Sequence, residues 1–166
     1  MSFLKRIIDR AKMDIKTIVL PEAADERVLK AASMIMENNI ANVILIGNED
    51  EVREAAGDID IFGADIVNPY ESDDFEDFVD TFYEMRKAKG VTYEEARQTM
   101  QNPLYYGVMM VKKDRADGMV AGAINSSADT LRPALQILKT APGTKLVSGF
   151  FVVEVPDPSF GADGAF

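Results

Sequence analysis

The stretch GAINSSADTLRP, residues 122–133, joins an apolar run at 119–121 to a helical pattern at 134–139. In open α/β sheets, a strand-to-helix turn at the carboxyl end of a strand is a common place for ligands. Free N–H groups and the helix dipole favour an anion there, and Arg132 adds a planar fork of donors suited to phosphate or carboxylate. If the helix begins near Thr130, Pro133 falls in its first turn, where proline is tolerated. The stretch therefore predicts an anion site.

Helix capping alone is a second interpretation of this stretch. Ser, Asn, Asp and Thr are ordinary N-cap and turn residues, so one of them before a helix carries no functional meaning. Here five such residues stand together with an arginine, which is denser than capping requires. Both interpretations stay open on the residues alone.

Composition limits the classes of protein that fit this chain. Its 166 residues are 47% hydrophobic, enough for one domain with a real core. The net charge of −10 argues against a general nucleic-acid binder, because phosphate contacts need clustered Lys and Arg. No apolar run approaches the ~20 residues of a membrane helix. We expect neither nucleic acid nor membrane as a partner.

The chain has no Cys and no His, which restricts its chemistry. A Ser-His-Asp triad, a thiolate nucleophile and a Cys-bearing zinc site are excluded. The acidic run at residues 71–80 is typical of a solvated helix face, an interpretation we prefer to a metal site, so we predict no metal. The lack of Cys fits a cytoplasmic protein.

Short apolar runs alternate with helical patterns along the chain. This alternation predicts a three-layer α/β/α domain with a largely parallel sheet. An amphipathic helix at residues 3–11 is expected to pack on this domain, Ser72 to cap a helix that stops at Gly90, and Thr92 with Glu95 to form a capping box. The expected strands lie at residues 17–20, 43–46, 65–67, 119–122 and 145–155.

Residues 141–143, Ala-Pro-Gly, form a break with linker character. The β-rich segment after them is followed by a loop, without the helix that an α/β unit would add. We therefore expect a first α/β domain at residues 1–141 and the truncated beginning of a second α/β domain at 142–166.

Several motifs together point to one family. They are TIVLPE at 17–22 with Asp25 and Arg27, ILIGN at 44–48, FYEMRK at 82–87, DGMVAGA at 117–123, SSADTLRPA at 126–134, VPD at 155–157 and GADG at 161–164. With these motifs the chain resembles the amino-terminal half of the phosphate acetyltransferase (phosphotransacetylase) family over essentially its whole length. Phosphate butyryltransferases are similar to it in scaffold.

The resemblance implies a reversible acyl transfer in which acetyl-CoA and phosphate give acetyl phosphate and CoA. It implies coenzyme A as a substrate, no tightly bound cofactor, and a homodimer in the full-length enzyme. The family's chains are about twice as long and supply an Asp, proposed as the base for the CoA thiol, from their second half. A segment that returns to complete the first domain is also absent here, so we expect residues 1–166 to be inactive alone.

The resemblance also implies roles for individual residues. Arg132 matches an active-site arginine near the phosphate or acetyl group, and Ser126, Ser127 and Thr130 match the hydroxyl loop that holds the anion. Arg86 matches an arginine linked to CoA binding, although a cation in the last turn of a helix is also an ordinary dipole partner.

Three functions remain to be compared. The leading one is a phosphate acetyltransferase or, with another acyl group, an enzyme like the phosphate butyryltransferases. The alternatives are a non-catalytic α/β module that binds phosphate or CoA, and an α/β fragment whose loop residues only cap a helix. Turnover distinguishes the first from the others, and ligand binding distinguishes the second from the third.

Overall fold

A computed structural model describes residues 2–157, 159–162 and 164–165 of the chain, and Asp163 of the GADG motif lies outside them. Its sheet has four parallel strands, β1 (Thr17–Leu20), β2 (Asn42–Ile46), β3 (Asp65–Val67) and β4 (Gly118–Met119), in the order β3-β2-β1-β4. The parallel α/β architecture predicted from the alternating pattern is confirmed.

The strand order reverses once, between β1 and β4. The chain moves outward from β1 through β2 to β3 and then returns to pair β4 with the other side of β1, with Val19 opposite Met119. Because all four strands are parallel, the loops that follow β1 and β4 leave the same edge of the sheet as neighbours. Such a reversal is where open α/β sheets bind their ligands.

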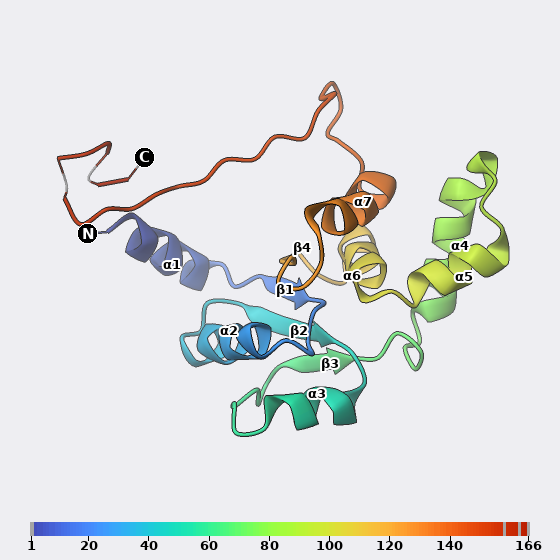
Figure 1. Cartoon of the computed structure of the whole chain (residues 1–166), viewed down its shortest axis with the longest axis horizontal. Helices are drawn as coiled ribbons and strands as arrows, with labels where there is room; N and C mark the ends of the chain where they lie inside the picture. The colour runs from blue at the N-terminus through green and yellow to red at the C-terminus, as the bar shows by residue number, and fades with distance from the viewer. Residues whose placement is uncertain (1, 158, 163, 166) are drawn as a thin grey trace.

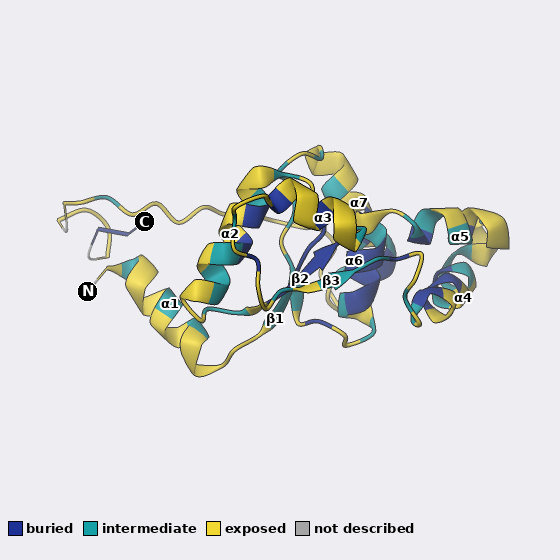
Figure 2. Ribbon diagram, turned by 90° about the horizontal axis from the view of Figure 1, so that it is seen from below, coloured by how far each residue is buried: buried dark blue, intermediate teal, exposed yellow. Residues whose placement is uncertain are grey.

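Helices cover both faces of the sheet (Figure 1). Side chains alternate along β2, so Val43 and Leu45 pack against α2 (Glu26–Glu37) and α3 (Glu49–Ala56). Ile44 and Ile46 face the second core, with buried residues of α4 (Phe75–Arg86), α5 (Tyr93–Met100), α6 (Pro103–Lys112) and α7 (Ser127–Ile137). Figure 2 shows this burial concentrated in the strands and in α6. The predicted three layers are confirmed.

Capping residues fix where several helices begin and end. The predicted capping box of Thr92 and Glu95 is present, and the 3₁₀ turn Lys87–Lys89 that follows α4 ends at Gly90, with φ +88°. Ser72 was the wrong cap for α4, because the N-cap is Asp74 and the Ser72 hydroxyl instead accepts the N–H of Asp74 at 3.2 Å.

The strand expected at residues 145–155 is wrong. The segment runs extended and exposed away from the sheet (Figure 1), with an isolated bridge between Glu154 and Ala165 in the described part of the chain. Phe150 and Phe151 are 88% and 94% exposed. A β-prone sequence forms a strand only where another strand supplies hydrogen-bond partners, and β1 to β4 do not reach this segment.

The amino-terminal helix α1 (Phe3–Met13) is present, but it does not pack on the domain as expected. None of its described residues is buried, and it projects from the sheet (Figure 1). Its first turn instead meets the end of the chain, where the Glu154 carboxylate accepts the N–H groups of Phe3 and Leu4, each at 3.1 Å. Among the described residues, no helix is both long and apolar enough to cross a membrane.

Candidate functional site

The loop between β4 and α7 is folded around one carboxylate, that of Glu22 in the β1–α2 loop. One oxygen of Glu22 accepts the backbone N–H groups of Gly122 and Ala123, both at 2.7 Å. The other accepts those of Ile124 and Asn125 at 3.0 and 2.9 Å, and the Asn125 side-chain amide at 2.7 Å. Gly122 has φ +111°, a value that L side chains rarely adopt and that lets the chain turn here. The expected strand at 119–122 accordingly ends at Met119.

Glu22 is only 4% exposed, yet it remains ionised. Burial by itself would raise its pKa, but the hydrogen bonds from Ile124, Ala123 and Asn125 outweigh burial and lower the pKa from 4.5 to about 2. A charged side chain of the protein therefore occupies the N–H groups of Gly122 to Asn125. Of the N–H groups expected to be exposed at residues 125–130, that of Asn125 is therefore not free to bind an external anion.

The same loop is also held through a carbonyl. Arg27, in the first turn of α2, donates to the backbone oxygen of Ala123 at 2.7 Å. Asp25 orients this guanidinium with hydrogen bonds at 2.9 and 2.7 Å. The hydrogen bond from Arg27 in turn lowers the pKa of Asp25 to about 2. The β4–α7 loop is thus held through its N–H groups by Glu22 and through the Ala123 carbonyl by Arg27.

The start of α7 places the predicted hydroxyl residues. Ser126 is the N-cap, and its hydroxyl accepts the N–H of Asp129 at 3.2 Å and donates to the Asp129 carboxylate at 2.7 Å. Ser127 is the first helical residue, and the N–H groups of Ser127 and Ala128 have no acceptor among the described residues. Together with the N–H of Ser126, which likewise has no acceptor among the described residues, they are the backbone donors of this stretch without an internal partner.

The helix begins three residues earlier than predicted, and this changes the position of Pro133. Because α7 starts at Ser127 rather than near Thr130, Pro133 lies in its second turn, where it cannot donate to the carbonyl of Asp129. Thr130 lies in the first turn, and its Oγ1 is buried without a hydrogen-bond partner in the described structure.

Arg132 projects from α7 with 58% of its side chain exposed. Its Nη1 lies 3.7 Å from the Asp129 carboxylate, beyond hydrogen-bond distance, so the guanidinium keeps its donors available. The predicted residues Ser126, Ser127, Thr130 and Arg132 are therefore all within two turns of one helix, although Ser126 is already engaged as its cap.

Arg86 is the last residue of α4, on a different part of the chain. It lines a cavity of about 470 Å³ together with residues of α5, α6 and α7. Its Nε is buried and has no hydrogen-bond partner in the described structure. A buried donor without a partner, in a residue that lines a cavity, is an unusual arrangement for a side chain that only complements a helix dipole.

Tyr105 on α6 connects the two arginines and was missed by sequence reasoning. Burial raises the pKa of its phenol, while the charges of Arg132 and Arg86 act in the opposite direction. Its hydroxyl donates to Gln136 of α7 at 3.2 Å. Arg86 and Arg132, 46 positions apart in sequence, are therefore both near enough to this phenol in the tertiary structure to favour its ionised form.

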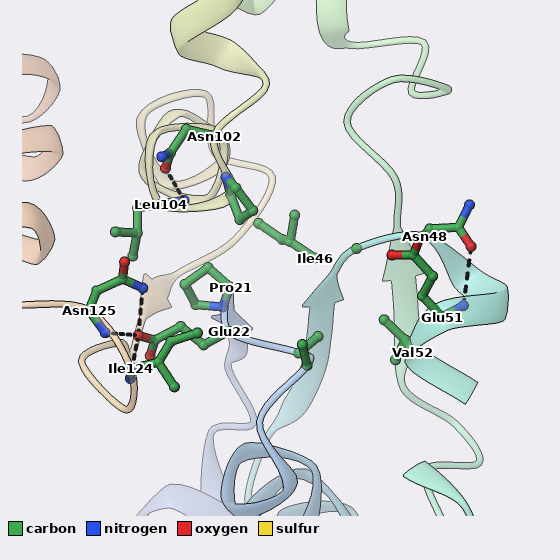
Figure 3. A pocket seen from close by; sticks show the side chains of 14 residues that line it. Pro21, Glu22, Ile46, Asn48, Glu51, Val52, Asn102, Leu104, Ile124 and Asn125 are labelled. Atoms are coloured by element: carbon green, nitrogen blue, oxygen red, sulfur yellow. Dashed lines mark hydrogen bonds between the residues drawn. The ribbon is translucent and has the colours of Figure 1, made fainter. Parts of the chain in front are cut away.

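A second cavity, of about 330 Å³, lies at the carboxyl ends of β1 and β2 (Figure 3). Glu22 and Asn125 lie at one end of it, and Asn48 and Glu51 at the other (Figure 3). Across the described part of the chain, no three metal-ligating side chains gather into a group that could hold an ion.

Comparison with known proteins is consistent with this α/β fold. A model of the family described as phosphate acetyl/butaryl transferase matches residues 2–166. Phosphate acetyltransferases of Acetivibrio thermocellus and Thermoanaerobacterium thermosaccharolyticum are 64% and 51% identical to the whole chain, which covers 50% and 51% of their lengths. The crystal structure of a phosphotransacetylase from Streptococcus pyogenes superposes with a TM-score of 0.88 at 38% identity, over 96% of this chain and 50% of that one.

The fold defines an α/β domain with a parallel sheet and helices on both of its faces. The chain belongs to the phosphate acetyl/butyryl transferase family, as the resemblance implied. It spans about half the length of the curated relatives it matches.

Proposed function

We propose that this chain is the phosphate-binding half of a phosphate acetyltransferase. The observation that carries the proposal is the group of unpaired donors at the start of α7, in a chain 64% identical to an enzyme of that name. The donors are the N–H groups of Ser127 and Ala128, the Thr130 hydroxyl and the Arg132 guanidinium. A helix N-terminus next to an arginine favours a bound phosphate.

In the proposed reaction, a phosphate oxygen attacks the acetyl carbonyl carbon of acetyl-CoA. The C–S bond breaks, acetyl phosphate forms, and CoA leaves as a thiolate that takes up a proton. Negative charge on the phosphate and on the carbonyl oxygen must be stabilised as the bond forms, a role that fits Arg132 and the N–H groups of α7. Holding phosphate and thioester side by side contributes a further, entropic share.

Arg86 is proposed to bind CoA through one of its phosphates. Its buried, unpaired Nε on the cavity wall supports a role beyond helix stabilisation. Through the family resemblance the proposal includes CoA as a substrate, a cytoplasmic location and a homodimeric whole enzyme. It also retains a division of the chain into a first domain at residues 1–141 and the beginning of a second at 142–166.

The test joins residues 1–166 to the remaining half of the Acetivibrio thermocellus relative. The fusion is assayed for acetyl phosphate formation from acetyl-CoA and phosphate, beside the unaltered relative as control. We expect turnover by the fusion and a large loss with Arg132→Ala. A folded fusion without turnover, or one that turns over equally well with Arg132→Ala, would contradict the proposal.

A further inference from the structure

Among the described residues, Glu22 is the only charged side chain that is buried. No salt bridge joins it to a cation among the described residues, although the charge of Arg27 interacts with it at longer range; its hydrogen-bond partners are four backbone N–H groups and one amide. Consecutive N–H groups that converge in this way form an anion-binding concavity. In this protein, the Glu22 side chain, supplied by the β1–α2 loop, fills that concavity.

We propose that Glu22 is a positioning residue for phosphate binding, acting as a permanent internal anion around which the β4–α7 loop folds. This inference rests on the proposed function, because it assigns phosphate to the start of α7. By occupying the N–H groups of Gly122 to Asn125, Glu22 directs an external anion to those of Ser127 and Ala128. It also fixes the residues that lead directly into the Ser126 cap.

The geometry requires a carboxylate at this position. Each oxygen of Glu22 accepts at least two hydrogen bonds, so both ends of the group must be acceptors. In Glu22→Gln, one end becomes an NH₂ group that faces two or three N–H donors, whichever way the amide is turned. Glu22→Asp keeps both acceptor oxygens, but its side chain is one methylene shorter. The carboxylate is therefore retained, with longer distances to the N–H groups of the loop.

Arg27 makes a second attachment to the loop. Arg27 donates a hydrogen bond to the Ala123 carbonyl, whereas Glu22 accepts one from the Ala123 N–H. Glu22 and Arg27 lie five positions apart, in the β1–α2 loop and the first turn of α2. Together they bind Ala123 through both its backbone N–H and its carbonyl. This double attachment explains how a loop of small residues keeps one conformation.

The first experiment measures amide hydrogen exchange in the 166-residue chain. In the wild type, the amides of Gly122 to Asn125 should be protected. In Glu22→Gln their exchange should be at least ~10-fold faster, and Glu22→Asp should fall between the two. Glu54→Gln, an exposed glutamate of α3, is the matched control and should exchange like the wild type. Wild-type protection in Glu22→Gln would overturn the proposal.

The second experiment titrates inorganic phosphate and follows the same amides by NMR. In the wild type, the signals of Ser127 and Ala128 should move while those of Gly122 to Asn125 do not. Glu22→Gln should weaken the phosphate affinity several-fold, and Glu22→Asp should recover part of it. Equal affinity in wild type and Glu22→Gln would refute the positioning role. If the wild type itself shows no response, the proposed phosphate site fails, while the exchange data still decide whether Glu22 organises the loop.

A third variant covers the case in which Glu22→Gln does not fold. Glu22→Ala leaves the concavity empty, so formate should enter it and restore protection of the Gly122 to Asn125 amides in a saturable manner. Chloride at equal ionic strength should not restore this protection. If formate has no effect, and the loop of Glu22→Ala stays unprotected or the chain stays unfolded, the N–H groups do not form an anion site.

Discussion

The guanidinium of Arg132 and the carboxylate of Asp129 are one helical turn apart on α7, with 3.7 Å between Nη1 and Oδ1. Asp129 is meanwhile bonded to the Ser126 hydroxyl at 2.7 Å. One oxygen of the acidic residue therefore completes the helix cap, and the other forms a long ion pair with the arginine, without a hydrogen bond. This division of roles makes Arg132 the cation available to an anion at the start of the helix.

Arg132→Lys, introduced into the fusion with the relative's second half, should lower the catalytic constant sharply. Lysine keeps the charge but loses the planar fork, and one lost charge-assisted hydrogen bond costs about 1.5–3 kcal/mol. Steady-state kinetics measure the effect. Arg53→Lys, in an exposed pair with Glu49, is the control and should change neither turnover nor melting temperature. An unchanged catalytic constant in a folded Arg132→Lys variant would make Arg132 structural.

Arg86→Ala should raise the Michaelis constant for CoA more than that for phosphate. The reason is the unpaired Nε on the wall of the cavity between α4, α5, α6 and α7. A role confined to the helix dipole predicts a different result, a loss of about 0.3–1 kcal/mol of stability with both Michaelis constants unchanged. Kinetics in the fusion beside thermal melting of each variant distinguish the two roles.

The ionised Glu22 should make stability depend on acid. Its pKa is lowered from 4.5 to about 2 in the folded state, so its contribution is complete above pH 4.5 and is lost as the pH falls toward 2. At 1.36 kcal/mol per pKa unit, this contribution amounts to about 3 kcal/mol.

Urea denaturation at several pH values between 7 and 2.5 measures this dependence. Asp25, whose pKa is also lowered, acts in the same direction, so the informative quantity is the difference between wild type and Glu22→Gln. That difference should shrink as the pH falls through the window. A difference that stays constant with pH would mean that the Glu22 charge does not contribute.

Residues 1–166 alone should show little or no acetyl transfer. The chain covers half of its curated relatives, and the described residues offer donors for phosphate without an assigned base for the CoA thiol. Reacting groups bound on one side only are neither aligned nor shielded from water. The measurement is acetyl-CoA formation from acetyl phosphate and CoA with protein free of host enzyme. Turnover near that of a full-length relative would show that the catalytic residues are assigned to the wrong places.

The exposed segment at residues 145–155 should cause the chain to self-associate. Phe150 and Phe151 are almost fully exposed on an extended backbone with unpaired N–H and C=O groups. Phe151→Ser should reduce association in sedimentation experiments. Phe62→Ser removes an equally exposed phenylalanine, 91% exposed, from a different loop and should have little effect. An equal reduction by both variants would mean that general hydrophobicity, not this segment, drives association.

The sequence by itself determined the α/β class and most element positions. Buried strands such as Val43 to Ile46 are continuous apolar runs because both faces of the sheet are covered, and caps such as Thr92 with Glu95 act within one helical turn. Local signals of this kind are sufficient to predict an element where the interacting residues are only a few positions apart. The family motifs added the residues to consider for phosphate and CoA.

Only the tertiary structure decided which side chain of the protein the β4–α7 loop binds. Glu22 and Asn125 are separated by 103 positions, and they meet because the strand order reverses between β1 and β4. Arg86, Tyr105 and Arg132 likewise come together through the packing of α4, α6 and α7. The segment at 145–155 shows the converse, since its strong β-propensity forms no strand without a partner. Propensity is a local property of the chain, whereas hydrogen-bond partners and electrostatic neighbours are set by topology.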